Sequence, residues 1–166
     1  MNKKTKIYVL FSLTLLVLSV IFLMYFYIVQ NNSKKILQTK DKVSGLIGLQ
    51  NLPLGFQKTI IVLFSPTCEH CQNKAQEIKN HIKEFSDIQI VMISSEDSVS
   101  INKFANYYQL NNLPNLQFLH LPKQKIFETF ASASVPRILV YDSEGNLIKD
   151  FNGEVKIEKL LKYVRR

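Results

Sequence analysis

The two cysteines of this 166-residue chain lie three positions apart, in the sequence Cys68-Glu69-His70-Cys71. They follow an apolar, β-branched run at residues 59–64, and a helical pattern begins where they stand. Two thiols with this spacing can close a small disulfide, and the helix dipole and free backbone N–H groups stabilise a thiolate on the first sulfur. The pattern therefore predicts a strand–loop–helix unit with a reactive dithiol, and it indicates thiol–disulfide exchange.

Two other interpretations of the cysteine pair stay open on these residues. The pair can be half of a zinc site, but zinc normally takes four ligands, and the remaining histidines, His81 and His120, stand alone. The pair can also be a purely structural disulfide, but so small a loop constrains the unfolded chain little. We expect no metal, and we interpret His81 and His120 as structural or surface residues.

An uncharged apolar run at residues 7–29 is long enough to span a bilayer. It ends in bulky and aromatic residues, with Tyr25 and Tyr27 among them, rather than at the small-residue cleavage site of a signal peptide. Residues 1–6 carry three lysines, which favours a cytoplasmic N-terminus. We expect a single-pass transmembrane anchor in the lipid bilayer and a domain outside the cytoplasm, in an oxidising compartment such as the periplasm.

The rest of the chain predicts a linker and one folded domain. Residues 30–56 are polar at first and then interrupted by glycine and proline, which is typical of a linker. Residues 57–166 have the length of an ordinary single domain. The formal net charge of +8 does not indicate a nucleic-acid partner, because the basic residues beyond the N-terminal flank are scattered and face 13 acidic ones.

Hydrophobic periodicity predicts alternating strands and helices in residues 57–166. We expect strands at 59–64, 88–93, 116–120, 138–141 and 147–151, and helices at 68–85, 97–110, 123–131 and 154–164. The turn-forming segment 142–146 is a hairpin signal between the last two strands. Strand–helix units followed by a hairpin and a helix predict an α/β fold, with a mixed central sheet flanked by helices.

Two segments resemble thioredoxin-like proteins. Residues 64–72, which contain the cysteine pair, are similar to the active-site segment of that family. Residues 135–146, which begin Val135-Pro136, are similar to its cis-proline loop and the strand and turn that follow. The resemblance covers about residues 57–166, and with the N-terminal anchor the chain is similar to the membrane-tethered TlpA/ResA kind of thiol–disulfide oxidoreductase.

The position of each cysteine predicts its role. Cys68 precedes the helix and is expected to be the exposed nucleophile, whereas Cys71 lies one turn in and is expected to resolve the mixed disulfide. His70 and Glu69 are expected to tune the redox couple in opposite directions, because an imidazolium stabilises a nearby thiolate and a carboxylate disfavours it.

The resemblance assigns the proline loop to substrate binding. It implies that Pro136 forms a cis peptide bond beside the disulfide and that the backbone of Val135 pairs with the substrate backbone. Arg137 follows these two residues. We leave two interpretations of Arg137 open, a solvated charge at the edge of the sheet or a substrate contact.

The chain departs from the family pattern at positions that concern proton transfer. Thr67 stands where thioredoxin has a tryptophan, and Val62 where it has a buried aspartate. Lys74 stands where reducing TlpA-like proteins often have a glutamate. The proton acceptor for the resolving thiol is therefore open between Glu69, Glu77 and water.

Together these features predict a membrane-tethered, extracytoplasmic thiol–disulfide oxidoreductase with a CEHC motif. It needs no bound cofactor, because the two thiols are the redox couple. The resemblance implies secreted or periplasmic client proteins, apocytochrome c among them, and a membrane-embedded or periplasmic thiol redox partner. One alternative is a non-catalytic redox-sensing or adaptor module with the same fold. Another is a peroxiredoxin, although the threonine of that family lies three residues before the cysteine and Thr67 only one.

Overall fold

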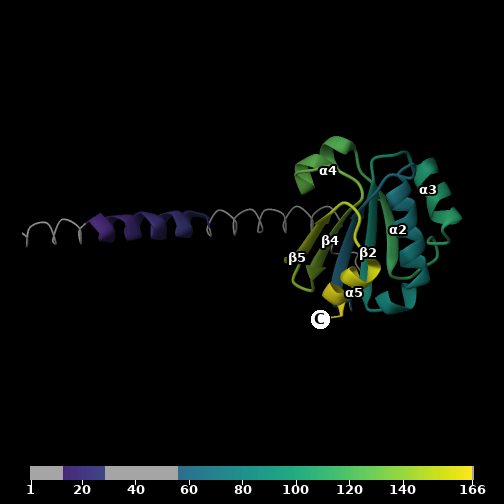
Figure 1. The fold of residues 1–166 in the computed structure, drawn as a ribbon. Helices are drawn as coiled ribbons and strands as arrows, with labels where there is room; N and C mark the ends of the chain where they lie inside the picture. Colours follow the sequence, from purple (N-terminus) through teal and green to yellow (C-terminus); the bar gives the residue numbers. More distant parts are fainter. Residues whose placement is uncertain (1–12, 29–55, 166) are drawn as a thin grey trace, which may run out of the picture. The chain divides into compact units, whose positions relative to one another are not determined.

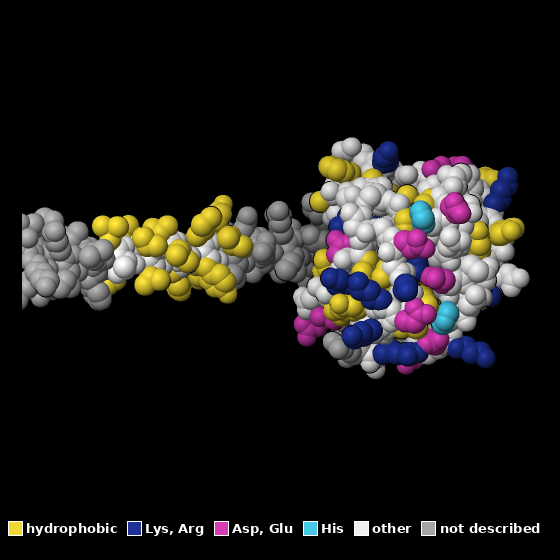
Figure 2. All heavy atoms as spheres, in the orientation of Figure 1, with side chains coloured by type: hydrophobic (Ala, Val, Ile, Leu, Met, Phe, Trp, Pro, Cys, Tyr) yellow, Lys and Arg dark blue, Asp and Glu magenta, His cyan; other side chains and the backbone are white. Residues whose placement is uncertain are grey.

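The computed structural model describes residues 13–28 and 56–165, which belong to two separate compact units. Residues 13–28 form a helix of exposed, mainly apolar side chains (Figure 2). Within the described ranges, no helix has the length and hydropathy needed to cross a membrane. Both ends of the predicted span 7–29, and almost all of the predicted linker 30–56, lie outside the described residues, so these two assignments stay predictions.

A five-stranded mixed sheet in the order β3-β2-β1-β4-β5 forms the centre of the second unit. The strands are β1 (Lys58–Leu63), β2 (Ile88–Ser94), β3 (Leu116–His120), β4 (Arg137–Asp142) and β5 (Leu147–Asn152). The first three strands are parallel, and β4 runs antiparallel to both β1 and β5. The predicted α/β fold with a mixed sheet is confirmed.

Helices cover both faces of this sheet. They are α2 (Glu69–Asn80), the 3₁₀ helix η2 (Ile82–Phe85), α3 (Ser98–Tyr107), α4 (Lys123–Phe130) and α5 (Ile157–Val164). Side chains of α2, α3 and α5 pack with one face of β1, β2 and β4. Side chains of α4 pack against the opposite face. In Figure 1 the ribbon of α4 stands apart from those of α2 and α3. The central strands are buried on both sides for this reason, and β2 is buried over its whole length.

Three predicted helices are longer than the observed ones by more than one residue, and in each case the backbone or a contact at the helix end differs from the expected helix. The predicted helix 68–85 is interrupted at His81, whose imidazole Nδ1 contacts the Glu77 carbonyl oxygen at 3.0 Å. Helix α3 ends early because Gln109 adopts a left-handed backbone conformation with φ of 53°. Helix α5 begins only after Lys156, its N-cap residue.

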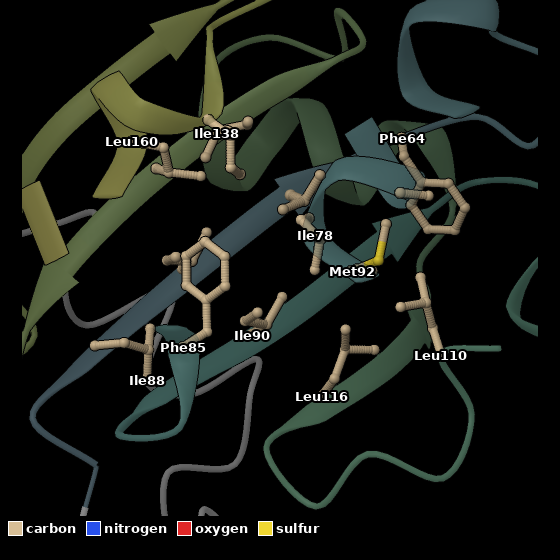
Figure 3. Packing of buried hydrophobic residues seen from close by; sticks show 14 of the residues in the cluster. Phe64, Ile78, Phe85, Ile88, Ile90, Met92, Leu110, Leu116, Ile138 and Leu160 are labelled. Atoms are coloured by element: carbon tan, nitrogen blue, oxygen red, sulfur yellow. The ribbon is translucent and has the colours of Figure 1, made fainter. Parts of the chain in front are cut away.

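The core next to the cysteine segment contains an aromatic cluster. The ring of Phe64, the residue after β1, lies 4.8 Å from that of Phe104 on α3 and 5.8 Å from that of Phe118 on β3. Figure 3 shows Phe64 beside Met92 in this packing. The loop that carries the cysteines therefore starts from a firmly packed residue, since Phe64 is only 2% exposed.

The strand register brings the cysteine segment and the cis-proline segment to the same end of the central strands. Leu63, the last residue of β1, pairs with Ile93 on β2 and with Arg137, the first residue of β4. The segment that leaves β1 towards the cysteines and the segment that enters β4 from Pro136 therefore lie side by side. The carboxyl ends of the parallel strands lie at this same end of the sheet, which is the usual place for a site in an α/β sheet.

Candidate redox site

Backbone hydrogen bonds fix the loop between β1 and α2. Cys68 is the N-cap residue of α2, and its N–H donates to the Ser65 carbonyl at 3.1 Å. The Gln72 N–H donates to the Cys68 carbonyl at 3.0 Å, which opens the helix. The Gln72 side-chain amide donates back to the Pro66 carbonyl at 2.8 Å. In the described part of the chain the Cys68 side chain makes no capping hydrogen bond, so its sulfur is not committed to holding the helix end.

The two free thiols differ in their surroundings. Cys68 is partly exposed, whereas Cys71 is 1% exposed and belongs to the apolar cluster beneath α2. Burial, and after it a hydrogen bond with the Cys68 side chain, raise the pKa of the Cys71 thiol to about 12. This asymmetry agrees with an attacking Cys68 and a resolving Cys71, but these roles stay predictions.

His70 has a partner that the motif alone does not show. Its Nδ1 atom lies 3.0 Å from the Glu154 carboxylate, in the segment between β5 and α5, and the two side chains are 61% and 54% exposed. Glu69 is exposed in the first turn of α2. No local signal in the sequence links residues 70 and 154, which are joined only through the fold.

The Val135–Pro136 peptide bond is cis, as the resemblance implied. Pro136 is buried, and its carbonyl oxygen accepts a hydrogen bond from the Gly153 N–H at 2.9 Å. Val135 is 38% exposed beside it. The register described above places this loop across from the cysteine loop, and the assignment of both residues to substrate binding stays a prediction.

Arg137 is engaged in structural contacts. Its guanidinium donates to both carboxylate oxygens of Asp150 at 3.0 and 2.7 Å and to the Phe130 carbonyl at 2.6 Å. The side chain is only 12% exposed. The interpretation of Arg137 as a solvated edge charge is therefore wrong, because the guanidinium joins β4 to β5 and to the end of α4.

The remaining candidates are spread over the fold. His81 caps the carboxyl end of α2, and His120 is exposed at the end of β3. Within the described residues there is no group of three or more histidine, cysteine or acidic side chains arranged to hold a metal ion.

Lys74 is the residue whose surroundings sequence reasoning missed. It is 1% exposed, and its ammonium contacts the Glu77 carboxylate and the Val155 carbonyl oxygen. Of the two glutamates considered as proton acceptors for Cys71, Glu77 is thus bound to a buried lysine, whereas Glu69 is exposed to solvent.

An open cavity of about 480 Å³ lies beside the cysteine loop. It is bordered by the loop, the start of α2 and the outer part of α3, through Pro66, Gln72, Ser100, Lys103, Phe104, Tyr107 and Tyr108. Tyr107 is 79% exposed at its rim. The surface near the candidate nucleophile is therefore hollowed, and three aromatic residues, Phe104, Tyr107 and Tyr108, contribute to its lining.

Comparison with known proteins identifies relatives of this arrangement. Residues 34–156 match the AhpC/TSA family. No curated protein matches the chain.

Solved structures with the same fold include three bacterial proteins. A secreted Mycobacterium tuberculosis disulfide oxidoreductase homologous to E. coli DsbE is 17% identical, with a TM-score of 0.56 over 66% of this chain and 81% of that chain. StoA from Bacillus subtilis is 14% identical, with a TM-score of 0.55 over 67% and 84%. Peroxidoxin BcpB from Mycobacterium tuberculosis is 16% identical, with a TM-score of 0.57 over 68% and 80%. At these identities the likeness establishes the fold, and the thioredoxin-like architecture is confirmed.

Proposed function

The chain belongs to the AhpC/TSA family, and from this premise we propose that it is a thiol–disulfide oxidoreductase acting on protein clients through Cys68-Glu69-His70-Cys71. The observation that carries the proposal is the asymmetry of the two thiols. One sulfur is partly exposed at a helix N-terminus, and the other is buried one turn further along. An exposed attacking thiol and a shielded resolving thiol are what a dithiol exchanger requires.

In the reducing direction, the Cys68 thiolate attacks a client disulfide. A bond forms between the Cys68 sulfur and one client sulfur, and the other client sulfur leaves as a thiolate. The Cys71 thiolate then attacks the Cys68 sulfur, which forms the Cys68–Cys71 disulfide and releases the second client thiolate. Two electrons pass to the client, and the same steps in reverse oxidise a client dithiol.

A trapping experiment tests this division of labour. Cys71→Ala should accumulate mixed disulfides with client proteins, because the covalent intermediate has lost its resolving thiol, and Cys68→Ala should accumulate none. The adducts are read by acid-quenched, non-reducing electrophoresis, together with turnover of insulin disulfides by the unmodified protein. If only the Cys68→Ala variant formed adducts, the attacking and resolving roles of the two cysteines would be reversed. Adducts with neither variant, and no turnover, would favour a non-catalytic adaptor.

We also propose that residues 7–29 tether the protein to a membrane with residues 30–166 outside the cytoplasm. The exposed apolar side chains of helix 13–28 and the lysines of residues 1–6 support this topology (Figure 2). Clients would then be secreted or periplasmic proteins such as apocytochrome c, and a membrane-embedded or periplasmic thiol protein would exchange electrons with the site. Protease added to spheroplasts should digest residues 30–166, and protection there would contradict the proposal.

A second candidate function is the reduction of a peroxide by Cys68. Ser65 stands three residues before Cys68, the position of the peroxiredoxin threonine, and its hydroxyl lies 3.0 Å from that of Thr67. In this reaction the Cys68 thiolate takes the terminal peroxide oxygen as a sulfenic acid and releases an alkoxide or hydroxide. Cys71 then condenses with the sulfenic acid, releasing water and forming the disulfide. Consumption of hydrogen peroxide that exceeds insulin reduction would favour this candidate.

A further inference from the structure

Four consecutive residues between β5 and α5 contact both loops of the candidate site. The first two of residues 152–155 bind the proline loop, residues 134–136. The last two bind α2, the helix that begins at the cysteine pair. We call residues 152–155 the brace, because they join two parts of the site that come from different strands.

The brace holds the proline loop on either side of Val135. The Ser134 hydroxyl donates to the side-chain oxygen of Asn152 at 2.9 Å. The Gly153 N–H donates to the Pro136 carbonyl at 2.9 Å, which extends the pairing of β4 with β5 by one residue. Val135 is 38% exposed and lies between these two bonded residues. Its backbone is therefore fixed while its surface stays open to a partner.

The other half of the brace holds the first turns of α2. The Glu154 carboxylate lies 3.0 Å from the Nδ1 atom of His70, which stands between the two cysteines. One turn further along, the buried Lys74 ammonium donates to the Val155 carbonyl. The helix whose N-cap residue is Cys68 is thus bound to the same four residues as the proline loop.

A polypeptide client has to meet both loops at once. The resemblance to thioredoxin-like proteins implies that the client backbone pairs with Val135 while a client sulfur reacts at Cys68. Both contacts form together only if the two loops keep the right separation, and small displacements of groups that position a substrate can be costly. The brace is bonded to both loops and so controls this separation.

We propose that Asn152 and Glu154 are positioning residues for client binding, which hold the proline loop and the cysteine helix at the separation that a polypeptide client spans. The inference rests on the exchange function proposed above. Neither residue takes part in the transfer between sulfurs. A small disulfide without a peptide backbone needs only the Cys68 sulfur, so its reaction should not depend on the brace.

The experiment compares two disulfides in the full-length chain, held in detergent. Insulin, reduced with dithiothreitol as the electron donor, gives KM and kcat. The uncharged reagent 4,4′-dithiodipyridine gives the rate of thiol attack alone, from the absorbance of the first thiopyridone released in stopped flow. Glu154→Ala removes the contact with α2, and Ser134→Ala removes the hydrogen bond to Asn152. Each should raise the KM for insulin about threefold with kcat unchanged, the size expected for one exposed contact. The reaction with 4,4′-dithiodipyridine should stay unchanged.

Two exposed residues outside the brace provide matched controls. Glu158→Ala, in the first turn of α5, removes an equal charge, and Ser143→Ala, in the β4–β5 turn, removes an equal hydroxyl. Neither should alter either reaction. The double variant Ser134→Ala/Glu154→Ala tests the link between the loops. If both contacts act through one brace, its effect on KM should be smaller than the product of the single effects, whereas independent contacts would multiply.

The outcomes separate this inference from the function on which it rests. If the unmodified chain reduces no insulin, the proposed exchange function fails. If it reduces insulin but Glu154→Ala leaves KM in place, or slows both disulfides equally, the positioning role is overturned. Fully multiplying effects in the double variant would also overturn it. Should Glu154→Ala lose its fold, as circular dichroism would reveal, Ser134→Ala decides the question from the other end of the brace, since its hydrogen bond is exposed.

Discussion

The burial of Cys71 predicts that the reduced protein loses stability at alkaline pH. The pKa of this thiol is raised from 9.0 to about 12, chiefly by burial and then by the hydrogen bond with Cys68. The unfolded chain releases the thiol proton above about pH 9, whereas the folded chain keeps it, so the unfolded state binds fewer protons in this window. Stability is therefore fully present below pH 9 and falls as the pH rises towards 12.

The slope of this loss follows from linkage. One proton of difference between the two states changes the free energy of unfolding by about 1.4 kcal/mol per pH unit. Raising the pH from 9 to about 10.5 should therefore cost about 2 kcal/mol. The full separation of the two pKa values limits the total loss to about 4 kcal/mol. Because a domain of this size is stable by about 5–15 kcal/mol, the effect is well within measurement.

A matched pair of variants isolates this contribution. Burial also raises the pKa values of Tyr108 and Tyr141, which titrate in an overlapping range and act in the same direction. Urea unfolding should therefore compare Cys68→Ala with the double variant Cys68→Ala/Cys71→Ala, neither of which can form the disulfide. The tyrosines contribute equally to both, and the difference between the two unfolding free energies reports Cys71 alone.

We expect this difference to be constant up to about pH 9 and then to shrink by about 1.4 kcal/mol per unit. Removing Cys68 also removes its hydrogen bond to Cys71, the second cause of the raised pKa. The pH range over which stability is lost becomes narrower, but the loss of unfolding free energy per pH unit stays the same. A difference that stays flat to pH 10.5 would show that Cys71 ionises as easily in the folded chain as in the unfolded one. The assignment of Cys71 as the shielded thiol would then fail.

Three further outcomes follow from individual residues. At pH 7.5, iodoacetamide should modify Cys68 well before Cys71, read by mass spectrometry, since a thiol with a pKa of about 12 is scarcely ionised there; equal rates would contradict the burial. Tyr141→Phe should stabilise the fold by about 1 kcal/mol in urea unfolding, because its buried hydroxyl finds no hydrogen-bond partner in the described residues, and destabilisation would reveal one. Gly153→Ala should destabilise by about 1–2 kcal/mol through backbone strain alone, because φ is 91° and an added Cβ meets nothing within 4 Å; an unchanged midpoint would refute that strain.

The part of the site that depends on residues adjacent in the sequence could be predicted. The β-branched run and the cysteine spacing placed Cys68 at a strand–helix junction, which the structure confirms. The order of strands and helices followed from periodicity, and the resemblance identified the cis bond before Pro136, which is confirmed. Helix ends were less predictable, because they depend on single residues such as Gln109, whose positive φ no periodicity reveals.

The part that depends on contacts between distant segments was not predictable. Arg137 reads as an exposed charge in sequence, yet the hairpin register pairs its strand with that of Asp150, and contacts with Asp150 and the Phe130 carbonyl leave its side chain only 12% exposed. Lys74 reads as one more lysine on a helix face, yet the Val155 carbonyl and the Glu77 carboxylate satisfy its ammonium in the interior. Both results require knowledge of what packs against the element, which propensity and spacing do not contain.

The same reasoning explains why the motif does not disclose the direction of electron flow. In Cys68-Glu69-His70-Cys71 an imidazolium is expected to favour the thiolate and a carboxylate to disfavour it. The structure adds a group from far along the chain, because the Glu154 carboxylate lies 3.0 Å from the Nδ1 atom of His70. The cation of Lys74 is likewise balanced by a carboxylate outside the motif. Because the carboxylate that faces His70 is supplied by the fold, the four residues of the motif do not by themselves determine the balance between oxidised and reduced forms.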